Sequence, residues 1–222
     1  MKRIYLIMLM IVAMMVSCNP KDEDDNNNSG GNGNNGGGSD GKINGYEYVD
    51  LGLPSGLKWA TCNVGASSPE DYGDYFAWGE TSPKAEYTYE NSITYGEQMS
   101  DISGNAQYDA ATANWGGNWR MPTKKEIQEL RTHCEFEWIQ VNGVNGSKVV
   151  GPNGSCIFLP AAGRLLGSSL YGDGERGNYW SSTPDDNSLD DSAWRLNFYY
   201  GIEDVDWLGY RYLGFTVRPI TE

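Results

Sequence analysis

The sequence is poor in histidine and in positive charge. It has one histidine, His133, and 16 lysines and arginines against 30 aspartates and glutamates, so the formal net charge is −14. A single histidine excludes catalytic triads and zinc sites that are built on histidine pairs. The acidic balance repels phosphate backbones and anionic lipid headgroups, which argues against nucleic acid as a partner.

Long apolar runs are also missing, apart from one near the N-terminus. The segment from Ile4 to Val16 follows a short basic stretch, and its length is typical of a signal peptide rather than of a bilayer span. Cys18 follows closely and resembles the cysteine of a bacterial lipobox, although Met15 and Val16 replace the commoner residues. We expect residues 1–17 to be a lipoprotein signal peptide and Cys18 to carry the lipid. An ordinary secreted protein or an uncleaved anchor is the alternative.

The next segment, residues 18–41, lacks the apolar residues that a core needs. NPKDEDDNNN resembles the acidic export tag that carries lipoproteins of Bacteroidota across the outer membrane, and solvated linker charges are the other interpretation. Asn, Gly, Ser and Asp then dominate, and they cannot bury enough area to offset their ordering entropy. We expect a disordered tether over residues 18–41 and one domain over residues 42–222. The chain would be an outer-membrane lipoprotein exposed at the cell surface.

Cysteine is scarce within the domain. Three cysteines follow Cys18, so an oxidising compartment allows one disulfide with a thiol left over, or none, and the pairing stays open. Cys134 and Cys156 fall among apolar residues. We interpret both as core residues or disulfide partners, not as reactive thiols.

The domain is predicted to consist mainly of short strands separated by glycine turns. Residues 46–66 alternate apolar and polar residues around Pro-Ser-Gly, which predicts a β-hairpin, whereas residues 71–94 indicate a long loop with brief strand pieces. Asn142-Gly143, Asn145-Gly146 and Pro152-Asn153-Gly154 have the composition of tight turns. We expect further strands within residues 135–143, 147–154, 155–163, 178–184, 192–201 and 212–220.

One helix is strongly indicated, in WGGNWRMPTKKEIQEL. Thr123 and Glu126 form a capping box, and Ile127, Leu130 and Cys134 then fall on one face. Residues 105–115 predict a shorter helix. Before Thr123, Trp119 and Met121 are expected to pack beneath a sheet, and Pro122 is expected to end the incoming strand. A chain of many short strands and one or two helices is an α+β domain.

Six motifs follow one another in a specific order between Gly45 and Ile220: YVDLGLPSGLKWATCNVGA, AWGE, WGGNWRMPTKKEIQEL, GPNGSCIFLPAAG, NYWSST and GFTVRPI. Their succession resembles the FISUMP family, the Fibrobacter-type major paralogous domain. That family is similar to the C-type-lectin-like fold, in the branch shared with formylglycine-generating enzymes and the variable proteins of diversity-generating retroelements. Met121 for leucine and Thr216 for serine are mild departures. The resemblance implies twisted antiparallel sheets flanked by one or two helices, long loops, and chain ends close together.

The catalytic and calcium-binding residues of these relatives are not matched in this sequence. Formylglycine-generating enzymes use a late cysteine pair, and no cysteine follows Cys156. Sugar-binding C-type lectins hold calcium through Glu-Pro-Asn or Gln-Pro-Asp and Trp-Asn-Asp, none of which occurs. The run DDNSLDD at residues 185–191 lacks the glycine and glutamate of an EF-hand and is interpreted as a solvated turn. We predict no metal, no cofactor and no catalytic residue. A carboxylate pair for glycoside hydrolysis stays open, since no spacing singles one out.

Aromatic residues, by contrast, are abundant, with 15 tyrosines and eight tryptophans. Many lie in segments too polar to be buried, and tyrosine and tryptophan suit binding surfaces because they offer rigid contact area. In diversified members of the resembling fold, the stretch before the final GFSVRP-like motif faces the ligand. The alternative is that half of these residues alternate into the sheet. The candidate ligand-binding residues are Tyr199, Tyr200, Asp204, Asp206, Trp207, Tyr210 and Tyr212.

The expected function is therefore non-catalytic ligand binding by a surface adhesin or receptor. The partners would be the membrane, through the N-terminal lipid, and a glycan or protein ligand. One alternative is a surface enzyme that processes glycans, or its accessory subunit. Another is a structural component at the tip of a fimbria-like assembly.

Overall fold

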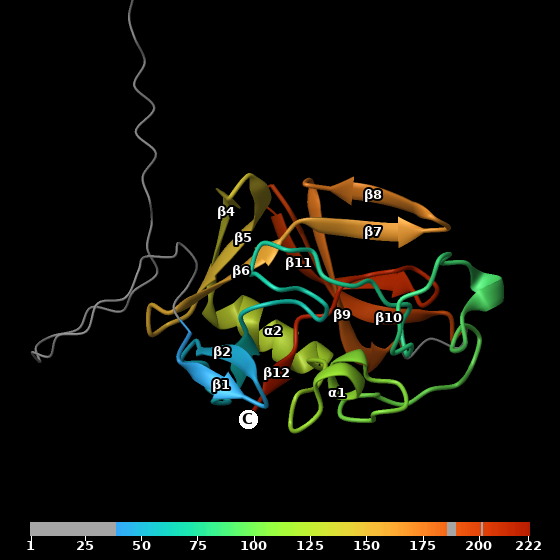
Figure 1. Cartoon of the computed structure of the whole chain (residues 1–222), viewed down its shortest axis with the longest axis horizontal. Coiled ribbons are helices and arrows are strands. Elements are labelled where there is room, and N and C mark those ends of the chain that lie inside the picture. The colour runs from blue at the N-terminus through green and yellow to red at the C-terminus, as the bar shows by residue number, and fades with distance from the viewer. Residues whose placement is uncertain (1–38, 186–189, 201) are drawn as a thin grey trace, which may run out of the picture.

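The computed structural model describes residues 39–185, 190–200 and 202–222, and of residues 203–207 it describes the backbone. Antiparallel sheets dominate these residues, with few and short helices, so the predicted α+β class is confirmed (Figure 1). The elements, in chain order, are β1 (Gly41–Ile43), β2 (Tyr46–Asp50), β3 (Lys58–Ala60), the 3-10 helix η1 (Tyr89–Asn91), α1 (Ala110–Trp115), α2 (Lys124–His133), β4 (Glu135–Val141), β5 (Val144–Val150), β6 (Cys156–Pro160), β7 (Ala162–Leu166), β8 (Ser169–Asp173), β9 (Arg176–Pro184), β10 (Ser192–Tyr199), β11 (Ile202–Tyr210) and β12 (Ile220–Thr221).

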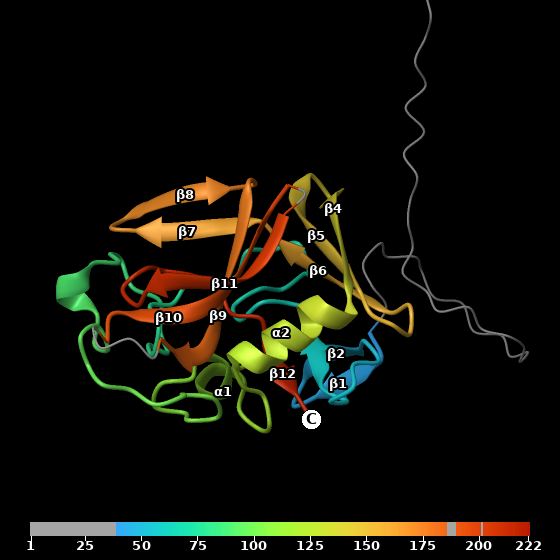
Figure 2. The same cartoon turned by 180° about the vertical axis from the view of Figure 1, so that it is seen from behind.

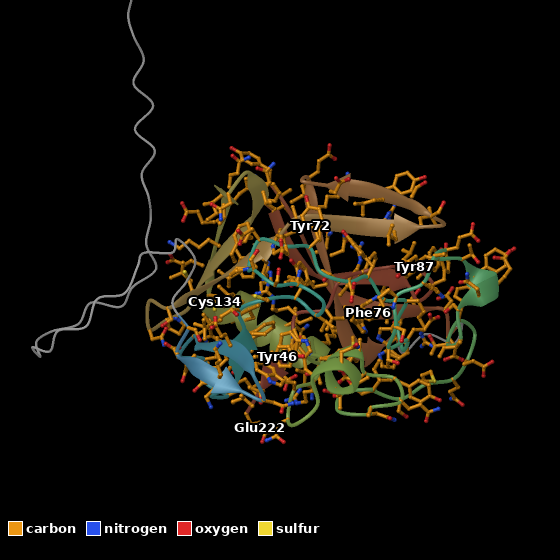
Figure 3. All side chains as sticks on the ribbon, in the orientation of Figure 1. Tyr46, Tyr72, Phe76, Tyr87, Cys134 and Glu222 are labelled. Atoms are coloured by element: carbon orange, nitrogen blue, oxygen red, sulfur yellow. The ribbon has the colours of Figure 1, made fainter. Side chains whose placement is uncertain are left out.

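One sheet contains both ends of the domain, in the order β1-β2-β3-β12. The predicted hairpin is confirmed, because β2 and β3 pair antiparallel with Val49 opposite Trp59. On the other side of β3, Ile220 of β12 also pairs with Trp59. The C-terminal Glu222 accordingly lies beside β1 and β2, at the end of the molecule that also holds Tyr46 (Figures 1 and 3). The expectation that the chain ends lie close together is met by this sheet.

Strands β4, β5 and β6 form an antiparallel meander. Asn142 and Gly143 have φ values of 50° and 86°, as a tight turn between β4 and β5 requires. The second predicted turn was wrong, since Asn145 and Gly146 lie inside β5 and pair with β4. Gly146 is needed there for a different reason: a Cβ atom would clash with the backbone oxygen of Leu159 on β6.

The C-terminal segment, residues 212–220, is less regular than the predicted strand. It makes isolated bridges, such as Phe76 with Phe215 and Leu165 with Gly214, and only β12 is a strand. Within this segment, Thr216 and Arg218 are as buried as Phe215. The segment runs between the loop at Phe76 and strand β9, which pair with its two edges.

Arg218 is the most deeply buried charge on this segment, with 1% of its surface exposed. Its Nε donates to Asn63 Oδ1 at 2.8 Å, its Nη1 to the carbonyls of Ala60 and Thr61 at 3.0 and 2.7 Å, and its Nη2 to the carbonyl of Phe158 at 3.0 Å. All of these acceptors are neutral, and burial lowers the pKa of the guanidinium. One side chain thereby connects the end of β3, strand β6 and the C-terminal segment.

The junction WGGNWRMP connects several other elements. The indole of Trp119 is buried and donates to Ile43 O on β1 at 2.9 Å. Met121, also buried, donates its backbone N–H to Asp109 Oδ2 at 2.9 Å, and the same carboxylate caps α1. Arg120 and Ile220 exchange backbone hydrogen bonds of 3.1 and 3.0 Å. The expected packing of the tryptophan and the methionine is confirmed, and the junction fixes β1, α1 and β12 around them.

Helix α2 has the predicted capping box. Thr123 Oγ1 accepts from Glu126 N at 3.3 Å, and Glu126 Oε2 accepts from Thr123 N at 2.7 Å. Ile127 and Leu130 are buried, and the helix packs against β9, β10 and β11 (Figure 2). His133 is exposed at the C-terminal end of the helix.

Replacing Thr123 with alanine should destabilise the domain by about 1 kcal/mol, because the N-cap hydrogen bond is lost. Equilibrium urea unfolding measures the change. Thr132→Ala, at an exposed site near the other end of α2, is the matched control and should leave the unfolding free energy within about 0.5 kcal/mol of wild type. Equal stability of Thr123→Ala and wild type would show that the cap contributes nothing.

Arg218→Met should cost about 3 kcal/mol or more, because buried acceptors left without a donor each cost about 1 to 3 kcal/mol. Arg218→Lys keeps the charge but not the planar fork, so it should also destabilise. Arg131→Met, on the exposed side of α2, is the control. The measurement is the urea midpoint, or soluble yield if the variants fail to fold. Wild-type stability of Arg218→Met would contradict the cross-linking role.

Candidate ligand-binding pocket

A cavity of about 470 Å³ lies between the β7–β8 hairpin and strands β9 and β10. In Figure 1 the hairpin lies above strands β9 and β10. The cavity is partly open to solvent. The cavity, called the arginine pocket below, is lined by Arg164, Tyr171, Gly172, Glu175, Arg176, Asn178, Arg195, Asn197 and Tyr199.

The arginine pocket arises from strand periodicity. Arg195, Asn197 and Tyr199 occupy alternate positions of β10, so their side chains leave the same face of the sheet. The register then places Asn178 of β9 opposite Asn197 and Arg176 opposite Tyr199. A polar face therefore extends across two neighbouring strands.

The floor of the pocket is a buried hydrogen-bonded network. Asn178 Oδ1 accepts from the guanidinium of Arg195 and from Asn197 Nδ2, the latter at 3.0 Å. Asn178 Nδ2 donates to Gly163 O at 2.9 Å, which attaches the network to β7. The guanidinium of Arg195 also lies 5.0 Å from the centre of the Phe215 ring. These contacts hold the floor in one arrangement before any ligand arrives.

The rim of the pocket is more exposed and carries the remaining charges. Arg164 is half-buried on β7, and Arg176 is exposed at the start of β9. Tyr171 and Tyr199 are partly exposed aromatic walls. Glu175 is the one carboxylate among the described lining residues, against three guanidinium groups. In a chain with a net charge of −14, this pocket is locally positive. Arginine forks in such a site suit carboxylate, sulfate or phosphate groups.

The predicted site residues separate into several groups. Tyr199 lines the arginine pocket. The backbone register places Asp204 opposite Asn197 and Trp207 opposite Arg195, but the side chains of Asp204, Asp206 and Trp207 lie outside the described residues.

Tyr200 and the other two predicted tyrosines lie away from the pocket. Tyr200 is 77% exposed at the end of the β10–β11 hairpin, and its ring contacts Trp138 edge-on at 6.3 Å between centroids. Tyr210 and Tyr212 lie at the other end of β11, where their rings stack. The segment is a paired hairpin, and its strand register distributes these residues over different surfaces.

Sequence reasoning missed the arginines and asparagines of the pocket. A signal was available for part of the set: in the predicted strand from residue 192, arginine, asparagine and tyrosine recur at every second position. The contributions of Arg164, Arg176 and Asn178 required the cross-strand register and the position of the β7–β8 hairpin, which local patterns do not determine.

The described residues offer neither a metal site nor a membrane-spanning helix. Within them, no group of three or more His, Cys, Asp or Glu side chains is arranged to hold a metal ion. The middle of the DDNSLDD run, residues 186–189, and the predicted lipidation site Cys18 lie outside this set. No helix in the described ranges has the length and apolar character needed to cross a bilayer.

Cys134 is the C-cap residue of α2, and its partly buried side chain packs against the core (Figure 3). Burial raises its pKa to about 12, so very little of it is thiolate at neutral pH. Cys62 and Cys134 are both free thiols. Cys156 is buried in β6. The interpretation of Cys134 as an unreactive, core-associated residue fits this environment.

Cys134 should be alkylated by iodoacetamide at pH 8 about a thousandfold more slowly than a free cysteine, because a pKa of about 12 leaves little thiolate compared with the usual value of about 8.5. Mass spectrometry of the peptide containing Cys134 follows the reaction. In urea the rate should rise to that of a free cysteine. Fast labelling of the folded protein would contradict the burial.

Comparison with known proteins places the chain in a family. Residues 52–221 match the Lcl C-terminal domain, a range that includes every residue of the arginine pocket. Neither the curated proteins nor the solved structures yield a match. Because the family match extends over well more than half of its length, the chain belongs to the Lcl C-terminal domain family.

Proposed function

We propose that this chain is a non-catalytic binding protein, and that its arginine pocket captures an anionic group of a glycan or protein ligand. The observation that carries the proposal is the charge of the pocket. Three arginines and two asparagines surround it in a chain that is otherwise strongly acidic. Such a local inversion of charge attracts an anion and orients it through donor groups that are already in place.

The chemistry of the lining groups favours binding over catalysis. Guanidinium and amide groups do not change their protonation state near neutral pH. They can therefore hold a ligand but cannot act as general acid and base. Glycoside hydrolysis uses two carboxyl groups, and the described lining offers one, Glu175. The floor groups Asn178 and Asn197 also donate hydrogen bonds within the protein, which suits a rigid receptor.

The walls of the pocket suggest how a larger ligand is accommodated. Tyr171 and Tyr199 come from different strands and are partly exposed. Tyrosine rings give rigid contact area at low entropic cost, so they can pack against the apolar part of a ligand whose charged group reaches the arginines. A cavity of about 470 Å³ holds a terminal group or a short piece of a polymer rather than a whole chain.

The cellular setting is part of the same proposal. The segment around Cys18 and the polar tether predict an outer-membrane lipoprotein that displays the domain at the cell surface, as an adhesin or receptor. The six ordered motifs, together with antiparallel sheets and few helices, support a C-type-lectin-like domain of the FISUMP type.

The double variant Arg164→Gln, Arg176→Gln should lower affinity for anionic ligands at least tenfold, because two of the rim guanidinium groups are removed. A panel of carboxylated, sulfated and neutral oligosaccharides and acidic peptides, probed with the purified protein, measures this. The control Lys125→Gln, Arg131→Gln makes the same charge change on exposed positions of α2. It should leave binding within about twofold, since distant exposed charges are screened by salt.

Several outcomes would contradict the proposal. Equal binding of neutral and anionic ligands, or full binding by the pocket variant, would remove the role of the arginines. Release of reducing sugar from a polysaccharide would favour the enzyme alternative. Recovery of the chain only within a stable envelope assembly would favour a structural component.

A further inference from the structure

A second surface, away from the arginine pocket, gathers four tyrosines whose rings are in contact. Tyr89 and Tyr95 lie 6.2 Å apart between ring centroids, and each meets Tyr212 edge-on, at 6.4 and 5.4 Å. Tyr210 stacks on Tyr212 at 5.5 Å with planes 9° apart. Tyr89 is 59% exposed and Tyr210 50% exposed. These four residues are called the tyrosine cluster.

The tyrosine cluster combines segments that are distant in the sequence. Tyr89 begins the 3-10 helix η1, Tyr95 follows in the same long loop, and the other two tyrosines come from the end of β11 and the turn after it. In Figure 1, η1 is the green coil at the right edge, at the opposite end of the molecule from β1, β2 and the C-terminus. The surface therefore faces away from the side at which the domain is tethered.

Arg211 holds the two halves of the tyrosine cluster together. It is fully buried between Tyr210 and Tyr212 in the sequence, and its guanidinium stacks on Trp78 at 4.6 Å. Its Nη1 donates to Thr94 O and Glu97 O at 3.0 and 2.7 Å, the two carbonyls that flank Tyr95 along the loop.

Further hydrogen bonds fix the loop that carries Tyr89 and Tyr95. Lys84 Nζ binds Glu80 at 2.8 Å and Asn91 O, at the end of η1, at 3.1 Å. Thr94 Oγ1 donates to Trp78 O at 2.6 Å, and Gly96 N donates to Asp190 O at 2.9 Å. These hydrogen bonds hold the loop in one conformation, so the exposed rings lose little conformational entropy when a partner binds.

The surroundings of the tyrosine cluster are acidic. Glu90 follows Tyr89 and is exposed, and Glu97 is exposed in the same loop. Asp190 and Asp191 approach from the other side, where the backbone of Asp191 accepts from Arg211. Arg211 is fully buried, and its Nε and Nη1 donate to carbonyl groups, so its guanidinium is not exposed to a ligand.

The charge of the arginine pocket reaches one edge of the tyrosine cluster. Burial raises the pKa of Tyr212, as do the neighbouring tyrosines and Asp191, whereas Arg164 lowers it. Three arginines line the pocket, whereas exposed carboxylates surround the cluster, so the two surfaces differ in charge.

We propose that the tyrosine cluster is a docking surface for a basic protein segment that presents arginine or lysine side chains. Cations bind the faces of tyrosine rings, and the surrounding carboxylates complement their charge. Ile93, 61% exposed in the same loop, adds apolar contact for the stems of those side chains. An anionic partner would be repelled, and a neutral glycan would leave the carboxylates unused.

The test uses the full chain and a synthetic peptide of alternating arginine and glycine, with fluorescence anisotropy as the readout. The variant Tyr89→Ala, Tyr210→Ala should weaken binding about tenfold. The matched control Tyr200→Ala, Ile202→Ala removes exposed apolar groups at the distant hairpin end and should stay within twofold of wild type. Circular dichroism and thermal unfolding establish that both variants are folded.

A second pair of variants examines charge. Glu90→Gln, Glu97→Gln should weaken peptide binding and reduce its dependence on salt, whereas Glu135→Gln, Glu137→Gln, exposed on β4, should change it little. Wild-type peptide affinity of the tyrosine variant would show that net charge alone attracts the peptide, and would overturn the proposal. So would preferential binding of a neutral glucose oligomer that the tyrosine variant loses.

Discussion

The fold depends on arginine side chains buried among neutral hydrogen-bond acceptors. Arg218 connects β3, β6 and the C-terminal segment, Arg211 connects the end of β11 to the loop at Thr94, and Arg195 connects strands β10 and β9. Burying a guanidinium is costly, and the cost is offset only when its donors find well-placed acceptors. The domain has long connections with little regular structure of their own. The hydrogen bonds of these arginines hold the connections in place, as backbone hydrogen bonds do within helices and sheets.

The same constraint explains which parts of the fold were predictable. The capped helix and the turn at Asn142-Gly143 were predicted correctly, because both depend on interactions between residues a few positions apart. Charged residues are usually exposed, whereas Arg218 is buried. Its burial follows from carbonyl groups at Ala60 and Phe158, which are distant in sequence, so no local pattern could reveal it. Asn145-Gly146 has the composition of a turn, but the glycine is needed because β6 approaches the backbone too closely for a side chain.

The candidate site shows the same division. Tyr199 was predicted from the family resemblance and the aromatic composition, and it lines the pocket. The tyrosines grouped with it in the sequence are distributed to different surfaces by the β10–β11 register. Composition indicated that this part of the chain has more aromatic groups than a core requires. It could not indicate that a pocket of positive charge lies beside an acidic aromatic surface, because both need the β7–β8 hairpin and the loop near η1 in their folded positions.

The sheet β1-β2-β3-β12 has a consequence for how the domain can be combined with others. Its first and last strands are separated by three strand spacings, or about 14 Å at about 4.8 Å each. A linker of about six residues could join them, which makes the domain suited to circular permutation or to insertion into a loop of a host protein. Both ends would then enter the host from one side, and the opposite end of the domain, with η1, would remain free.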